Sequence, residues 1–297
     1  MGGSRHADPT SPRKHVDREA ATLVCHARRL KQRGWRGLVW LSGAPAQARQ
    51  QALALWQAAD WQAPLWVGDA QQSPVAASLP SRKARTRLGA EHQLVILDAS
   101  SHEGLDPDAL GALAGTVSAG GLLVLVTPSP WGCQPDPNYA RFADYPWPWE
   151  HLSAHYLTRM ARLLGASTEV VRWPVGGALR LPTLAKRPSA PESCEDTDCL
   201  TADQALAVSA LVKLKRRRPL VVTADRGRGK SAALGIACAR LLQQSDGGEW
   251  LLTAPRLSAV ESVFSRVAAL CPALQRHGPA EVSLPNGSRL RFLPPDV

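Results

Sequence analysis

Short apolar runs alternate with helical periodicity along the first 185 residues of the chain. Runs of Leu, Val and Ile without polar interruption are typical of strands that are covered on both faces. The predicted elements, in chain order, are a strand at 38–41, a helix at 46–59, strands at 65–67, 94–97 and 122–126, and a helix at 151–164. This alternation predicts a Rossmann-like α/β domain with a parallel sheet at residues 18–185.

Two segments outside this pattern have different compositions. Residues 1–17 are polar, contain Pro9 and Pro12, and lack the apolar stretch of a secretory signal, so they predict a disordered leader of a cytoplasmic protein. Residues 186–201 lose periodicity and accumulate prolines and acidic side chains, which is the composition of a linker.

After this linker, residues 202–297 form a second α/β region. Its predicted elements are a helix at 202–215, a strand at 220–223, a helix at 231–243, a strand at 250–253, a helix at 257–270 and a β-like stretch at 288–293.

The predicted strand Leu220–Thr223 leads directly into the segment Ala224–Ser231, which reads Ala-Asp-Arg-Gly-Arg-Gly-Lys-Ser and opens an alanine-rich helix. This order of strand, glycine-containing loop and helix is the context of a P-loop. Gly227 and Gly229 let backbone N–H groups turn toward phosphate oxygens, and the new helix adds its positive N-terminal dipole. The departure at Ala224, where a glycine is usual, is minor.

Lys230 and Ser231 are the side chains that carry this chemistry. Lys230 is expected to reach the β- and γ-phosphates, and the Ser231 hydroxyl to bind Mg²⁺. Residues 202–297 are therefore predicted to be the N-terminal part of an incomplete, helicase-like P-loop NTPase domain.

Gln204 has two compatible interpretations. In several P-loop helicases, a glutamine about twenty residues before the loop reads the adenine edge. The same residue can also serve as position N3 of a helix that Thr201 caps.

The net charge of +10 favours a polyanionic partner. Basic side chains form two clusters, each of which can be an RNA-backbone site or a solvated face: Arg82, Lys83, Arg85 and Arg87, and Lys213, Lys215, Arg216, Arg217 and Arg218. No apolar run is long enough to cross a membrane.

Other candidate groups give weaker signals. Asp98 ends a strand and is interpreted as a cap rather than a Mg²⁺ ligand, because it precedes the P-loop by more than a hundred residues. His151 and His155 lack a third ligand, so a metal site is not expected. The six cysteines are expected to be free thiols, since only Cys194 and Cys199 are close and their spacing is not that of a zinc site.

Three segments together resemble bacterial tRNA(Met) cytidine acetyltransferases: Leu200–Gln204, Thr223–Gly235 and Leu252–Pro255. The Arg-Gly-Arg-Gly-Lys-Ser form of the loop is specific to that family. The segments Leu94–Ala99 and Gly120–Pro128 look like the family's N-terminal domain. The resemblance therefore covers nearly the whole chain after residue 17.

The resemblance implies an enzyme that acetylates the exocyclic amine of the wobble cytidine in elongator tRNA(Met), using acetyl-CoA and driven by hydrolysis of ATP or GTP with Mg²⁺ at Ser231. It implies tRNA as partner. From the sequence itself, no obligate protein partner is expected. The resemblance assigns nucleotide contacts to Gln204, Arg226, Gly227, Arg228, Gly229, Lys230, Ser231, Ala232, Ala233, Leu234 and Gly235.

The family pattern also includes an acidic Mg²⁺-binding strand, further helicase motifs, an acetyl-CoA-binding domain and a tRNA-binding tail, none of which is found in this sequence. We therefore expect an N-terminal segment with no catalytic residue for acetyl transfer. Two alternatives stay open: a nucleotide- or RNA-binding module without catalysis, and another P-loop RNA helicase or ATPase.

Overall fold

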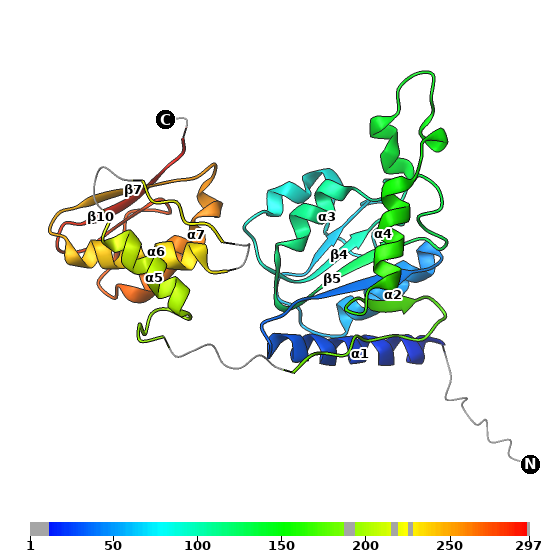
Figure 1. Cartoon of the computed structure of the whole chain (residues 1–297), viewed down its shortest axis with the longest axis horizontal. Coiled ribbons are helices and arrows are strands. Elements are labelled where there is room, and N and C mark those ends of the chain that lie inside the picture. The colour runs from blue at the N-terminus through cyan, green and yellow to red at the C-terminus, as the bar shows by residue number, and fades with distance from the viewer. Residues whose placement is uncertain (1–11, 187–193, 215–218, 225–227, 296–297) are drawn as a thin grey trace, which may run out of the picture. The chain divides into compact units, whose positions relative to one another are not determined.

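The computed structural model describes residues 12–186, 194–214, 219–224 and 228–295. Its packing divides the chain into two compact units, Met1–Arg187 and Pro188–Val297, and each is described by itself (Figure 1). The first carries the predicted Rossmann-like sheet and the second carries the predicted P-loop.

Unit 1 is built on a six-stranded, all-parallel sheet in the order β3-β2-β4-β5-β1-β6, which confirms the predicted fold class. Its strands are β1 (Gly37–Ser42), β2 (Leu65–Val67), β3 (Ser78–Leu79), β4 (His92–Asp98), β5 (Val117–Thr127) and β6 (Val171–Pro174). Its helices are α1 (Pro12–Lys31), α2 (Pro45–Gln57), α3 (Pro107–Ala114) and α4 (His155–Ala166), with 3-10 turns η1 (Ser81–Arg87), η2 (Pro137–Phe142) and η3 (Trp149–His151).

Helices cover both faces of this sheet, which explains the uninterrupted apolar runs. In β4, Leu94 and Ile96 pack in one cluster with α1 and α2, whereas Val95 and Leu97 pack in a second cluster with α3 and α4. Successive side chains of a strand point to opposite faces, so every position of this run is buried.

Helix α1 corrects the sequence prediction, because it begins at Pro12, inside the segment 1–17 that we expected to be disordered. Its buried apolar side chains recur three or four positions apart, at Ala20, Leu23, Val24, Ala27 and Leu30. Its buried Glu19 accepts hydrogen bonds from the indole N–H of Trp173 at 2.8 Å and from the backbone N–H of Leu179 at 3.0 Å. This apolar stripe and the carboxylate anchor attach the helix to the sheet.

Helix α4 begins later than predicted. His151 ends the 3-10 turn η3, extended backbone at Leu152 interrupts the helical path, and α4 starts only at His155. The two histidines therefore do not lie one turn apart on a single helix.

Unit 2 contains a four-stranded sheet in the order β7-β10-β9-β8. The pair β7–β10 is parallel, and the pairs of β9 with β10 and β8 are antiparallel. Its strands are β7 (Glu249–Thr253), β8 (Gln275–Arg276), β9 (Glu281–Ser283) and β10 (Arg289–Leu293), and its helices are α5 (Ala202–Val212), α6 (Lys230–Gln244) and α7 (Glu261–Leu270), with the 3-10 turn η4 (Leu257–Ala259). Side chains of α6 and α7 form the apolar core with β7, β9 and β10.

Candidate nucleotide site

The predicted loop enters helix α6 at Lys230, and Gly229 is the residue that caps it. Gly229 has left-handed backbone angles, with φ of 82° and ψ of 18°, a conformation that side-chain-bearing residues rarely adopt. A Cβ at this position would also lie 3.1 Å from the Nε2 of Gln204. The backbone conformation therefore favours glycine here, and a Cβ would also press on the Gln204 amide.

The start of α6 offers donors and positive charge to an anion. The first N–H groups of a helix have no partner within the helix, and its dipole places partial positive charge there. Arg228, Lys230 and Ser231 are exposed, and the first turn of α6 contains no acidic residue. The Nζ of Lys230 donates a hydrogen bond to the backbone carbonyl of Ala224, at the other end of the loop.

Gln204 lies against this loop, 25 positions away in sequence. Its Nε2 donates to the Gly229 carbonyl at 3.4 Å, and its Oε1 accepts from the Leu200 N–H at 2.8 Å. Its backbone N–H donates to the Thr201 hydroxyl at 3.2 Å, which confirms the predicted N-cap of α5. The structure thus joins the capping residue to the loop, while an adenine contact stays a prediction.

An acidic strap, defined as residues 194–201, holds the start of α5 on α6 and was not recognised from sequence. Arg240 of α6 binds both carboxylate oxygens of Asp196, at 2.8 and 2.6 Å, and one oxygen of Asp198 at 2.8 Å. Arg266 of α7 donates to the Asp198 carbonyl at 2.7 Å. The sequence predicts a linker at these residues, because their composition carries no signal of the helix that they contact.

The hydrogen bonds from Arg240 hold the pKa of Asp196 below its usual value, and the two aspartates raise the pKa of Arg240. Burial raises the pKa of the neighbouring Cys199 thiol, and the charge of Asp196 adds to this effect. The strap is therefore held by charge-assisted hydrogen bonds, and it fixes the segment that carries Gln204.

The prediction of a strand at Leu220–Thr223 is wrong. These residues are not in a strand and belong to neither sheet of the described structure. Val221 is 80% exposed and Leu220 is 40% exposed. A strand exists only where a neighbouring strand supplies its ladder hydrogen bonds, and the sheet of unit 2 does not place one beside this segment. Apolar composition alone could not reveal this.

The remaining predicted nucleotide contacts fall into two groups. Arg226 and Gly227 lie outside the described residues. Ala232 and Leu234 are partly buried, whereas Ala233 and Gly235 are buried. A Cβ on Gly235 would lie 2.7 Å from the Cβ of Arg266 in α7, so this glycine permits the two helices to pack closely. Nucleotide contact at these four positions stays a prediction.

Asp98 behaves as the predicted cap. Its Oδ1 accepts hydrogen bonds from the Ser100 N–H at 3.0 Å and hydroxyl at 2.6 Å, and its Oδ2 lies 2.6 Å from the Nε of Arg49. Its side chain is almost fully buried. The carboxylate is therefore occupied within unit 1.

The first basic cluster lies on η1, where its four cationic side chains are exposed and Arg85 approaches Asp108 at 3.2 Å. In the second cluster, Lys213 is exposed at the C-terminal end of α5, and residues 215–218 lie outside the described residues. Throughout the described ranges, no three His, Cys, Asp or Glu side chains gather as a metal site would require. None of the helices described is both long and apolar enough to cross a membrane.

A glycine-capped helix N-terminus with exposed Lys and Ser, carried by an α/β unit, is the loop-to-helix element of P-loop nucleoside-triphosphate-binding proteins. The six-stranded parallel sheet of unit 1 is Rossmann-like. Fold and site thus define a two-unit α/β protein of the P-loop class.

Two segments of the chain match family models of cytidine acetyltransferases. Residues 18–175 match the family described as "tRNA(Met) cytidine acetyltransferase TmcA, N-terminal", and residues 221–297 match "RNA cytidine acetyltransferase NAT10/TcmA, helicase domain". The first match spans more than half of the chain. The chain therefore belongs to the tRNA(Met) cytidine acetyltransferase family.

Individual relatives carry the same description, "tRNA(Met) cytidine acetyltransferase TmcA". A protein of Nitrosococcus halophilus is 37% identical over 95% of this chain and 38% of its own length. Proteins of Pectobacterium atrosepticum and Haloferax volcanii are each 34% identical, over 80% and 72% of this chain and 32% and 31% of their own lengths. The chain spans about a third of the length of these curated relatives.

Proposed function

We propose that unit 2 binds ATP with Mg²⁺ and serves an enzyme that transfers acetyl from acetyl-CoA to the exocyclic amine of the wobble cytidine of tRNA(Met). The observation that carries this proposal is the start of α6, where the left-handed Gly229 leaves the helix N-terminus open beside the exposed Lys230 and Ser231. The names of the relatives supply the reaction and the tRNA substrate.

The residues at this helix end fit a magnesium-bound triphosphate. The backbone N–H groups after Gly229 and the ammonium of Lys230 would hold phosphate oxygens, and the Ser231 hydroxyl would be a Mg²⁺ ligand. Gln204 touches the loop from α5 and would meet the adenine edge once its present hydrogen bonds exchange. When bound, the nucleotide supplies the phosphoryl-transfer energy, while acetyl-CoA supplies the acetyl group.

Binding of a fluorescent ATP analogue to the full chain tests the site. Lys230→Ala is expected to weaken binding at least about tenfold, because it removes a charge-assisted contact with phosphate. Ser231→Ala is expected to weaken binding in Mg²⁺ and to have no effect in EDTA. Fluorescence titration, with and without Mg²⁺, measures both effects.

The matched control is Lys213→Ala, which removes an exposed lysine from the end of α5 and is expected to leave ATP affinity unchanged. Equal affinities of wild type and Lys230→Ala would exclude this site. A phosphate-release assay with and without tRNA distinguishes hydrolysis from binding alone. Binding without release would favour a nucleotide-binding module over an ATPase.

A further inference from the structure

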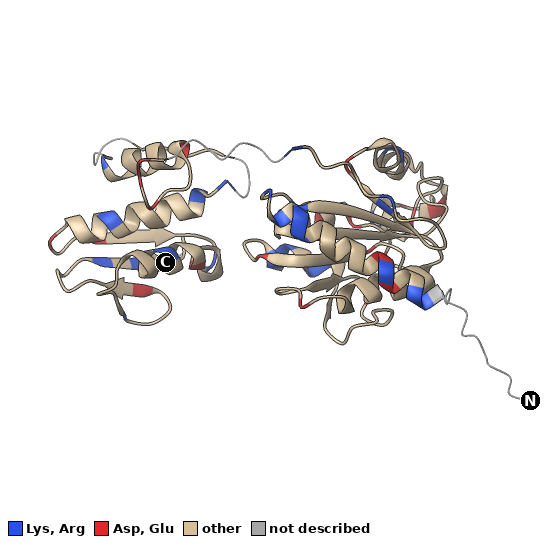
Figure 2. Ribbon diagram, turned by 90° about the horizontal axis from the view of Figure 1, so that it is seen from below, with Lys and Arg blue, Asp and Glu red and all other residues tan. Residues whose placement is uncertain are grey.

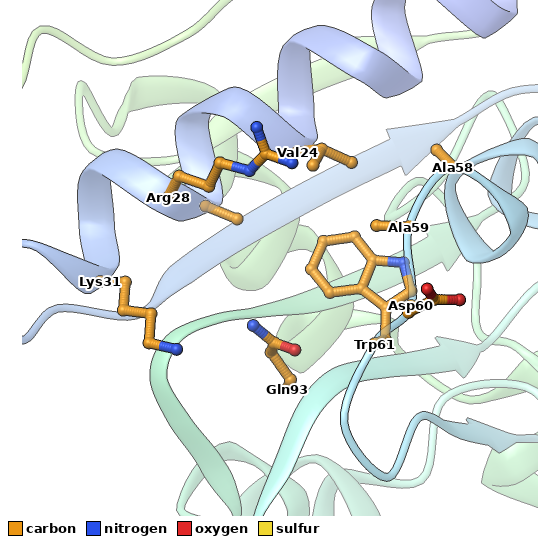
Figure 3. A pocket seen from close by; sticks show the side chains of 9 residues that line it. Val24, Arg28, Lys31, Ala58, Ala59, Asp60, Trp61 and Gln93 are labelled. Atoms are coloured by element: carbon orange, nitrogen blue, oxygen red, sulfur yellow. The ribbon is translucent and has the colours of Figure 1, made fainter.

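Unit 1 contains a hollow far in sequence from the P-loop, at the amino end of β4. Its accessible volume is about 400 Å³, and it lies between the last turns of α1, the loop that follows α2 and the first residues of β4 (Figure 3). Neither the proposed nucleotide site nor the family matches assign a role to it. Its size is that of one nucleotide rather than of one water or ion.

Two cations line one side of the hollow. Arg28 and Lys31 are three positions apart in the last turns of α1, so they lie on the same face of the helix, and both are exposed. Neither forms a salt bridge with any described residue. In Figure 2, blue bands mark both ends of this helix, which leads away from the N-terminal trace.

The side-chain amide of Gln93 supplies a hydrogen-bond donor in the hollow, between Lys31 and Trp61 (Figure 3). Gln93 lies between His92 and Leu94, where the register of β4 against β5 shifts, so it is not part of the regular ladder. The Oε1 of Gln93 accepts from the Gln62 N–H at 2.9 Å, which leaves its Nε2 without a partner among the described residues. Figure 3 shows the Gln93 side chain in the hollow.

The framework of the hollow is fixed by packing. Gly120 has a φ of 80°, and a Cβ on it would lie 2.4 Å from the Cβ of Lys31, so the last turn of α1 rests directly on this backbone. The Trp61 side chain is buried, and its indole N–H donates to the Leu55 carbonyl at 2.9 Å. The Lys31 Cβ and the Trp61 ring are therefore held in place by packing and do not need a ligand to position them.

Charge is distributed unevenly across the hollow. Figure 3 shows Arg28 and Lys31 on one side and Asp60 on the other, beyond the ring of Trp61. A phosphate is attracted to the cationic side and repelled from Asp60, whereas a ribose hydroxyl or a base amine can donate to this carboxylate. The arrangement suits a ligand with an anionic end and a donor end.

Cations in the last turn of a helix also stabilise its dipole. This effect accounts for Arg28 and Lys31 alone, but it does not account for the Gln93 amide beside them or for a hollow of nucleotide size. We propose that this hollow binds one nucleotide of an RNA chain, with its phosphate at Arg28, Lys31 and Gln93 and its sugar or base against Trp61. The proposal rests on the proposed function, which makes tRNA the RNA concerned.

The salt dependence of tRNA binding to the full chain tests this inference. Each phosphate contact contributes about 0.7–0.9 to the slope of log affinity against log salt. Because Arg28 and Lys31 hold one phosphate between them, Arg28→Ala/Lys31→Ala should lower the slope by about 0.7–0.9 and weaken tRNA binding about tenfold near 0.1 M salt. Anisotropy titrations of labelled tRNA(Met) at several salt concentrations give both quantities.

The matched control is Arg159→Ala/Arg162→Ala, which removes the same charge from exposed positions of α4. It is expected to change the affinity less than about twofold. Equal losses in the two double variants, or an unchanged slope in Arg28→Ala/Lys31→Ala, would overturn the proposal. Gln93→Glu tests the same site without altering α1 and is expected to weaken binding.

Asp60→Asn tests the orientation of the bound nucleotide, with its phosphate away from Asp60. It is expected to preserve or strengthen tRNA binding, because the amide oxygen of Asn still accepts a hydrogen bond from the sugar or base while the negative charge that repels phosphate is removed, and weaker binding would overturn the phosphate placement. The ATP affinity of Arg28→Ala/Lys31→Ala should equal that of wild type, which separates this site from the proposed nucleotide site. If the wild-type protein binds ATP but not tRNA, the proposed role of the hollow is refuted, whereas the proposed nucleotide site is not.

Discussion

Arg49 and Asp98 form an ion pair within unit 1, where the Arg49 Nε lies 2.6 Å from an Asp98 oxygen. Their side chains are 13% and 1% exposed. The strand position of Asp98 correctly predicted its capping bond to Ser100. Its partner could not be predicted, because the two residues are 49 positions apart and meet only after α2 has packed on the sheet.

Arg49→Met is expected to destabilise unit 1 by about 3–5 kcal/mol, because it leaves the Asp98 carboxylate buried without a counter-charge. The double variant Arg49→Met/Asp98→Asn should be less destabilised than the single one, since no charge remains buried. Chemical denaturation measures both. A double variant at least as unstable as the sum of the single variants would contradict this coupling.

At the scale of elements, the sequence predicted most helices and strands of both units. The buried runs at β4 and β5 are long enough, and their periodicity is clear enough, to identify the strands without tertiary information. The same reasoning assigned a strand to 220–223, where the composition is right but the ladder is absent. It passed over α1, although its apolar positions already had helical spacing in the sequence.

The acidic strap makes an element-scale prediction about pH. The pKa of Asp196 is lowered in the folded state, chiefly by Arg240, so the stability it contributes is present above its ordinary pKa of 3.8. This contribution is lost as the pH falls through the lowered folded value. Asp196→Asn should therefore lower the melting temperature of the protein at neutral pH, and the difference from wild type should shrink in acid.

Asp246→Asn is the control for this effect, because Asp246 is exposed, lies near the end of α6 and makes no hydrogen bond or ion pair with Arg240. Its melting temperature should follow that of wild type at every pH. A gap between Asp196→Asn and wild type that stays constant into acid would mean that the stabilisation does not depend on the carboxylate charge.

At the scale of the whole molecule, cysteines in both units differ in how far they are exposed to solvent. Cys25 and Cys133 are exposed, whereas Cys199, Cys238 and Cys271 are buried. Burial raises the pKa of Cys238 to about 11, so at pH 8 little of it is thiolate, the reactive form.

We expect a thiol reagent at pH 8 to modify Cys25 and Cys133 rapidly and Cys238 only after unfolding. Mass spectrometry of time-resolved labelling identifies each site. Cys25→Ser/Cys133→Ser should remove the fast phase, and rapid labelling of Cys238 in the native protein would contradict the packing of α6.

The sequence by itself determined the α/β class, the location of most strands, the P-loop motif and the family, because these depend on local periodicity and on short spacings of residue types. Only the tertiary structure decided that Gln204 touches Gly229, that Asp196 and Asp198 bind Arg240, and that residues 220–223 lie outside the sheets. It also gathered Arg28, Lys31 and Gln93 around one hollow. Each of these outcomes depends on contacts, formed or missing, between residues distant in sequence, so it arises from packing that local patterns do not encode.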